Sequence, residues 1–145
     1  MSLLQRLPVF AAALWWGSLT VVAVVVVPLL FIHLPTPALA GAMAGRLFSA
    51  QSWVALGCGM TLLMVSRGRE VAPRMDWAGG ALLFVAGGML LALLLEFAVA
   101  PRILARDNLR LWHAAGSTVL LLQWLCAAMV LWKVAGPSLR SGGPS

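Results

Sequence analysis

The chain has 145 residues, of which 62% are hydrophobic and 10% are charged. Soluble domains average roughly 45–50% apolar and about 25% charged residues, so this composition cannot build the polar exterior of a water-soluble fold. The ten Lys and Arg residues outnumber the four Asp and Glu residues. They lie between apolar runs and form no continuous basic stripe, which excludes nucleic-acid binding. The composition therefore predicts an all-α integral membrane protein.

Four apolar segments each reach or approach the roughly 20 residues that a helix needs to cross a bilayer. The predicted spans cover about residues 7–31, 47–65, 77–99 and 111–134. They form a transmembrane domain over residues 1–137, with Gly136-Pro137 as the expected stop of the last helix. Residues 138–145 are rich in Ser, Gly and Pro and are predicted to be a disordered tail. We expect a four-transmembrane-helix bundle with both termini on the same side.

Prolines and capping residues refine the ends of these spans. Pro28 is expected to kink or weaken the end of the first span. Thr36-Pro37 has the pattern of an N-cap followed by proline at the first helical position, so the second helix is expected to start well before Leu47. Pro101 favours an end or a kink of the third span, and Asp107 or Asn108 can cap the fourth helix.

Small residues recur along the second helix. Gly41, Gly45 and Ser49 stand at every fourth position, which puts them on one face and would let another helix approach closely. They are predicted to form a helix-packing seam. The alternative is that small residues are simply frequent in membrane helices.

The basic residues suggest an orientation. The face with both termini and the middle loop carries six, namely Arg6, Arg67, Arg69, Arg74, Lys133 and Arg140, whereas the opposite face carries four, namely Arg46, Arg102, Arg106 and Arg110. The positive-inside rule then places both termini in the cytoplasm. The expected location is the bacterial inner membrane.

This topology gathers polar side chains at the non-cytoplasmic face. The predicted ligand-binding residues there are His33, Arg46, Gln51, Glu96, Arg102, His113 and Ser117. Glu96 is the most informative because an unpaired carboxylate is costly so near the hydrocarbon, and the residues three and four away on its helix are apolar. Its partner is expected to be Arg46, Arg102 or His113. The alternative is a structural clamp, or a carboxylate that points toward headgroups.

Other polar residues give weaker indications. His113 and Ser117 share one helix face, and His33 could face them, so that two histidines could ligate haem or a metal. No His-x-x-x-His or Glu-x-x-His pair supports this rival reading, and we expect no cofactor and no metal. Gln123, near mid-depth in the last span, is expected to hydrogen-bond across helices, and the alternative is that it lines a path. Phosphate loops, nucleophile elbows and Cys-x-x-Cys pairs are missing from the sequence, so no catalytic residue is predicted.

Several short motifs carry a family resemblance. They are Trp16-Gly17 to Pro28-x-x-Phe31, Ala40-Gly41, Gly45-Arg46-Leu47-Phe48, Pro101-Arg102 and Trp112-His113-x-x-x-Ser117. This pattern resembles an uncharacterised four-span membrane family, a domain of unknown function related to the transmembrane protein 205 group of eukaryotes. The resemblance covers most of the chain and implies the four-span layout, with Gly45, Pro101, His113 and Ser117 as positions that the family uses. It implies no molecular activity.

The sequence thus leads to one main hypothesis and two alternatives. The main hypothesis is a non-enzymatic membrane protein whose polar cluster binds a small ligand, an ion or a lipid headgroup, in a transport or stress-related role. The first alternative is a haem- or metal-binding redox component. The second is a structural or assembly partner that acts through helix packing. The lipid bilayer is the expected surrounding, and a homo-oligomer or a membrane partner protein stays open.

Overall fold

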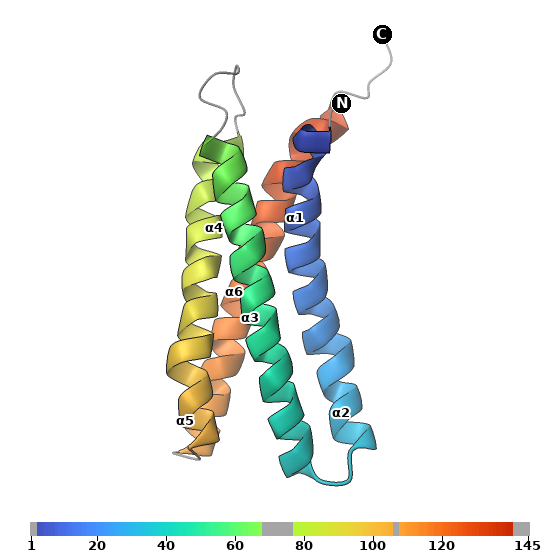
Figure 1. Ribbon diagram of the computed structural model, residues 1–145, viewed down its shortest axis with the longest axis vertical. Helices are drawn as coiled ribbons and strands as arrows, with labels where there is room; N and C mark the ends of the chain where they lie inside the picture. The colour runs from blue at the N-terminus through green and yellow to red at the C-terminus, as the bar shows by residue number, and fades with distance from the viewer. Residues whose placement is uncertain (1–2, 68–76, 106–107, 141–145) are drawn as a thin grey trace.

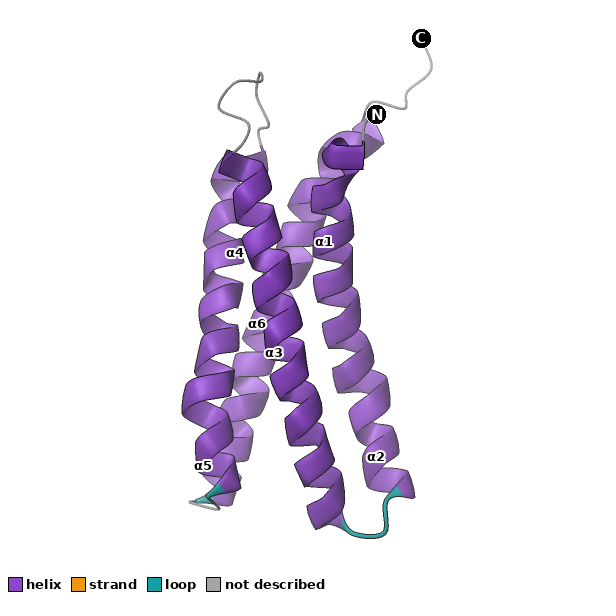
Figure 2. Cartoon of the chain, in the orientation of Figure 1, coloured by secondary structure: helices purple, strands orange, loops and turns teal. Residues whose placement is uncertain are grey.

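The computed structural model describes residues 3–67, 77–105 and 108–140. The first span consists of α1 (Leu3–Thr20), the π-helical turn η1 (Val21–Val26) and α2 (Val27–His33). The second span is α3 (Pro37–Arg67), and the fourth is α6 (Leu109–Arg140). The third span consists of α4 (Trp77–Leu94), the π-helical turn η2 (Leu95–Val99) and α5 (Ala100–Leu104). Within the described residues the chain forms helices and short loops and no strand (Figure 2).

Four stretches of these helices are long and apolar enough to cross a membrane. They are Arg6–His33, Pro37–Arg67, Gly80–Leu104 and Arg110–Gly136. α1 begins at the end of the bundle where α6 finishes, and α3 finishes and α4 begins at that same end (Figure 1). The predicted all-α bundle of four transmembrane helices is therefore confirmed, as is the placement of both chain ends on one side.

The first and third spans each contain a π-helical turn that ends two residues before a proline. Val27, which precedes Pro28, donates its backbone N–H to the carbonyl of Val22, five residues back, and Ala100, which precedes Pro101, donates to Leu95 in the same way. A proline has no N–H, and its ring clashes with the carbonyl four residues earlier, so a wider turn accommodates it inside a continuous span. The kinks expected at these prolines take the form of π-helical turns, which occur frequently at functional sites.

The bundle is closed around Trp15 in the half that holds the termini. Trp15 is completely buried. It lies against Gly88 of α4, where a Cβ atom would come within 2.7 Å of the indole. α1 packs against α3 and α6, and α4 packs against the same two helices, so the four spans form a ring. The absence of a side chain at Gly88 lets one large indole fill the centre of this ring.

The opposite half of the bundle is more open. α2 packs mainly against α3. In Figure 1, α2 stands well apart from α5 and from the first turns of α6, whereas α1 lies beside the last turns of α6. The first and fourth spans therefore diverge toward the last turn of α2 and the first turn of α6.

The ends of the helices agree only in part with the sequence. α3 begins at Pro37, and the Leu39 N–H bonds to the Thr36 hydroxyl at 3.3 Å, which is the predicted N-cap. α6 follows Asn108, whose φ of 39° a short polar residue tolerates. α6 runs to Arg140, past Gly136-Pro137, although residues 138–145 are predicted to be disordered. Residues 141–145, Asp107 and most of the middle loop lie outside the described residues.

Candidate functional site

A cavity of about 320 Å³ lies in the open half of the bundle. All four spans contribute to its wall, and we refer to it as the four-span cavity. Its lining residues are Ala23, Val27, Phe31, Gly41, Ala44, Gly45, Phe48, Leu95, Ile103, His113, Gly116, Ser117 and Leu120. Both π-helical turns contribute a side chain, Ala23 from η1 and Leu95 from η2. The turns that accommodate the two prolines therefore also shape this cavity.

At Gly41 and Gly45 the predicted packing seam on α3 does not contact another helix of this chain. A Cβ atom added to Gly41 or to Gly45 would meet nothing within 4 Å. Both glycines line the four-span cavity instead. The prediction of close packing within the chain is therefore wrong at these two positions, because helical spacing indicates which residues share a face but not what lies opposite that face. A contact between two copies of the chain at this seam stays a prediction.

Two of the predicted ligand-binding residues, His113 and Ser117, line the cavity together on α6. Both side chains are exposed. The Ser117 hydroxyl donates to the backbone carbonyl of His113 at 2.9 Å, so its lone pairs remain available as acceptors. The imidazole of His113 supplies a further polar group beside the cavity.

Glu96 has a different partner from those expected. Ser49 of α3 donates its hydroxyl proton to Oε1 of Glu96 in η2 at 2.6 Å. In the described parts of the chain no ion pair joins Glu96 to Arg46, Arg102 or His113. The expected charged partner is therefore wrong, and the carboxylate is held by a neutral hydroxyl from the residue that was assigned to the packing seam.

The predicted arginines and His33 lie apart from the cavity lining. Arg46 is exposed on α3. The guanidinium of Arg102 lies 4.4 Å from the ring centre of Trp112, which is a cation–π arrangement. Nδ1 of His33 lies 3.0 Å from the carbonyl oxygen of Leu29 in its own helix. The structure therefore distributes the predicted cluster over several separate places.

A layer of buried polar side chains lies deeper in the bundle. Gln51 donates from Nε2 to the Ser18 hydroxyl at 3.0 Å, and Ser18 donates to the carbonyl of Trp15 at 3.1 Å. Ser52 donates to the carbonyl of Phe48 at 3.0 Å. Gln51, predicted as a ligand residue, instead ties α3 to α1.

Gln123 lies at a similar depth on α6 and is 1% exposed. Neither Oε1 nor Nε2 of its amide has a hydrogen-bond partner among the described residues, so the expected bond across helices is not formed. An amide buried without partners costs roughly 2–7 kcal/mol, depending on the reference state. The sequence shows a polar residue at mid-depth but does not show whether the facing spans offer it a hydrogen-bond partner.

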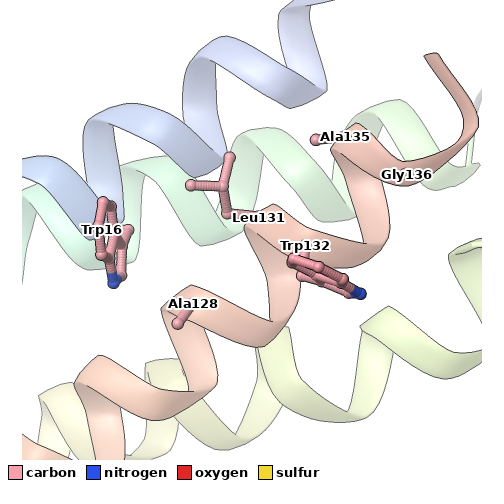
Figure 3. A pocket seen from close by; sticks show the side chains of 6 residues that line it. All are labelled: Trp16, Ala128, Leu131, Trp132, Ala135 and Gly136. Atoms are coloured by element: carbon pink, nitrogen blue, oxygen red, sulfur yellow. The ribbon is translucent and has the colours of Figure 1, made fainter. Parts of the chain in front are cut away.

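A second hollow, also of about 320 Å³, follows the contact between α1 and α6 in the closed half of the bundle. Figure 3 shows Trp16 of α1 at one end of this hollow, and the other lining residues follow one another along α6, from Ala128 through Leu131 and Trp132 to Ala135 and Gly136. The Trp16 and Trp124 rings lie 5.7 Å apart, and Trp124 donates its indole N–H to Thr20 at 2.8 Å. These contacts fasten the first span to the fourth near mid-depth. The hollow itself is lined by apolar atoms and offers little to orient a ligand.

Metal ligation has no support from the described residues. No group of three or more His, Cys, Asp and Glu side chains there is close enough to hold a metal ion. His33 and His113 are the only two histidines in the sequence, and only His113 reaches the four-span cavity. Uncharged side chains thus dominate the four-span cavity, which combines apolar walls with polar groups.

Fold and cavity together define a multi-pass α-helical membrane protein. The family described as a domain of unknown function (DUF4149) matches residues 10–111, and the chain belongs to this family. The predicted membership of an uncharacterised four-span family is thereby confirmed, while the relationship to the transmembrane protein 205 group stays a prediction. His113 and Ser117 follow directly after the matched range. Comparisons with curated proteins and with solved structures gave no match.

Proposed function

We propose that this protein binds a neutral, lipid-soluble molecule in the four-span cavity. The observation that carries the proposal is the chemistry of the lining. It consists of apolar side chains and glycines together with His113 and Ser117, and it includes no Asp, Glu, Lys or Arg among the described residues. A charged group would lie there without a counter-charge, which is expensive at this depth in the membrane. An uncharged molecule with one polar end fits this lining.

The size of the cavity supports the proposal. Pockets for small molecules have volumes of roughly 300–1,000 Å³ and are mostly apolar, with a few polar groups that fix orientation. The cavity volume of about 320 Å³ lies within this range. An apolar hollow binds water poorly because water needs several polar partners. Hydrocarbon is the occupant that the walls favour.

The divergence of the first and fourth spans provides a route of entry. Phe31 of α2 is 50% exposed, and His113 on α6 is exposed as well. Both residues line the cavity. A molecule dissolved in the bilayer can therefore enter sideways between α2 and α6 without passing through water.

We also propose that both termini are cytoplasmic and that the protein resides in a bacterial inner membrane. The support is the charge bias of the two faces. In this orientation the four-span cavity lies in the outer leaflet. The molecule that it binds would then be taken from the lipid of that leaflet.

Filling the cavity with a side chain tests the proposal. Gly45→Phe places a ring in the cavity, and the space beyond the Gly45 Cβ is empty to 4 Å, so the fold should tolerate it. The matched control is Gly57→Phe, because Gly57 lies on the same helix, is exposed and also has nothing within 4 Å of its Cβ. Native mass spectrometry of protein released gently from detergent micelles measures retained small molecules.

The wild type and Gly57→Phe should carry a retained neutral molecule, and Gly45→Phe should lose it at an unchanged melting temperature. Retention by all three proteins would place the molecule elsewhere and overturn the proposal. A wild type that retains only charged phospholipid would also contradict it, since the lining offers no charge to hold a phosphate.

A further inference from the structure

Gln123 follows, along α6, the residues of that helix that line the four-span cavity. Gly116 and Leu120 line the cavity, and Gln123 follows them by seven and three residues on α6. Residues three, four and seven apart share a helix face, so Gln123 continues the cavity face of α6. Long helical side chains lean toward the N-terminus of their helix, which directs this amide back toward Leu120.

The polar groups named above on the other spans have partners, and the buried indole N–H groups of Trp15 and Trp16, which have none among the described residues, are donors only and could not accept a hydrogen bond from Nε2 of Gln123. Gln51 donates to Ser18, Ser52 bonds to the Phe48 carbonyl, and the Thr20 hydroxyl accepts from Trp124. Gln123 is 99% buried, at 1% exposure, and both polar atoms of its amide lack a partner in the described part of the chain. A partner from outside the chain would satisfy the oxygen and the nitrogen together.

The chemistry of the amide defines this outside partner. Nε2 carries two N–H donors, and Oε1 beside it is an acceptor. A group with one donor and one acceptor side by side can form two parallel hydrogen bonds with such an amide. A primary carboxamide and a protonated carboxylic acid are both of this kind and are both uncharged.

We infer that the four-span cavity takes a long-chain acyl amide or a neutral acyl acid, with its polar head on Gln123 and its chain against Phe48, Leu95 and Leu120. This inference rests on the proposed function and adds the class of ligand and its direction. The head enters first, and the chain trails toward the opening beside Phe31. Gln123 is then the residue that selects the head group.

Three probes with the same chain test the inference on the full-length protein in detergent. Decanamide offers a donor and an acceptor, methyl decanoate offers acceptors only, and decane offers neither. Apparent dissociation constants come from thermal-shift titrations, because a ligand stabilises the fold that binds it. The wild type should bind decanamide about tenfold more tightly than decane, as two hydrogen bonds of ordinary net strength predict, with the ester between them.

The matched variant is Gln123→Met, which keeps the length of the side chain and removes both polar atoms. It should bind the three probes with equal affinity and melt no lower than the wild type without a probe. Titrations with decanoic acid and with decanamide at several pH values distinguish the two head groups. If decanoic acid binds tightly only below the pH at which it ionises, the natural head group is a protonated acid. If decanamide binds tightly at every pH, the natural head group is an amide.

Equal affinity of the wild type for decanamide and decane would mean that water, and not a ligand head group, hydrogen-bonds to the Gln123 amide. This result would overturn the inference and leave the proposed function intact. A marked fall in the melting temperature of Gln123→Met without a probe would assign the amide a partner within the protein and also overturn it. If none of the probes binds, and Gly45→Phe retains the same molecules as the wild type, the proposed function fails as well.

Discussion

The hydroxyl of Ser49 on α3 lies 2.6 Å from Oε1 of Glu96 and holds that carboxylate against the second span. Glu96 belongs to η2, the π-helical turn that precedes Pro101. A π-helical turn adds a residue to the helical repeat and so rotates the side chains that follow it. The proline that widens this turn thus helps to set which face of the third span carries the carboxylate.

Removing either member of the Ser49–Glu96 pair should destabilise the bundle. Hydrogen bonds between membrane helices contribute about 0.6 kcal/mol on average and up to about 2 kcal/mol. We expect Ser49→Ala and Glu96→Leu to show a coupling energy of about 0.5–2 kcal/mol in a double-mutant cycle. The free energy of unfolding in mixed micelles is the measurement.

The same cycle with Arg46 provides the control. Arg46 forms no ion pair with Glu96 in the described residues. The effects of Arg46→Ala and Glu96→Leu should therefore add within about 0.5 kcal/mol. A coupling energy larger with Arg46 than with Ser49 would contradict the geometry and restore the ion pair that the sequence led us to expect.

The bond from Trp124 to Thr20 should contribute to the attachment of α6 to the first span. In the wild type the Trp124 indole nitrogen lies 2.8 Å from the Thr20 hydroxyl oxygen. Thr20→Val keeps the shape of the side chain but removes this hydrogen-bond acceptor. We expect a loss of about 1–2 kcal/mol in unfolding free energy. Thr20→Ser retains the hydroxyl and serves as the control. Equal stability of the valine and serine variants would show that the bond contributes nothing.

The helices were predictable because their signals are local. Apolar length located four spans, and the Thr36 cap placed the start of α3 at Pro37. The last helix was less predictable. α6 continues through Gly136-Pro137 to Arg140, so the expected stop does not end this helix.

The site was predictable only in part, because its geometry depends on how the spans are rotated against one another. His113 and Ser117 were recognised as a pair on one face, and both line the cavity. Gly41 and Gly45 were recognised as sharing a face, but spacing alone cannot distinguish a seam from a cavity. The sequence does not indicate Ser49 as the partner of Glu96, because neither spacing nor charge shows which neutral hydroxyl of another span faces the carboxylate.

Both termini are expected in the cytoplasm. The face with the termini carries six of the ten basic residues, and the positive-inside rule assigns the more basic face to the cytoplasm. A green fluorescent reporter fused after Ser145 should be bright, and a phosphatase that is active only outside the cytoplasm should stay silent at the same position. The opposite pattern would reverse the orientation and move the cavity to the inner leaflet.

The close approach of Trp15 to Gly88 should make this glycine intolerant of any side chain. A Cβ at Gly88 would lie 2.7 Å from two indole carbons and 3.3 Å from the Cβ of Cys126. Trp15 is completely buried, so its indole cannot move aside into the surroundings of the bundle. We therefore expect Gly88→Ala to lower the free energy of unfolding by about 1–3 kcal/mol, as overpacking of a filled core does.

The adjacent glycine supplies the matched control for this prediction. A Cβ at Gly87 would meet only the Cys126 sulfur at 3.9 Å, an ordinary contact. Gly87→Ala should leave the stability unchanged or raise it by up to about 1 kcal/mol, since alanine favours the helix. Trp15→Phe combined with Gly88→Ala should be more stable than the sum of the two single effects, because a smaller ring leaves room for the added methyl group. Equal effects of alanine at the two glycines would mean that the indole does not lie against α4 at Gly88.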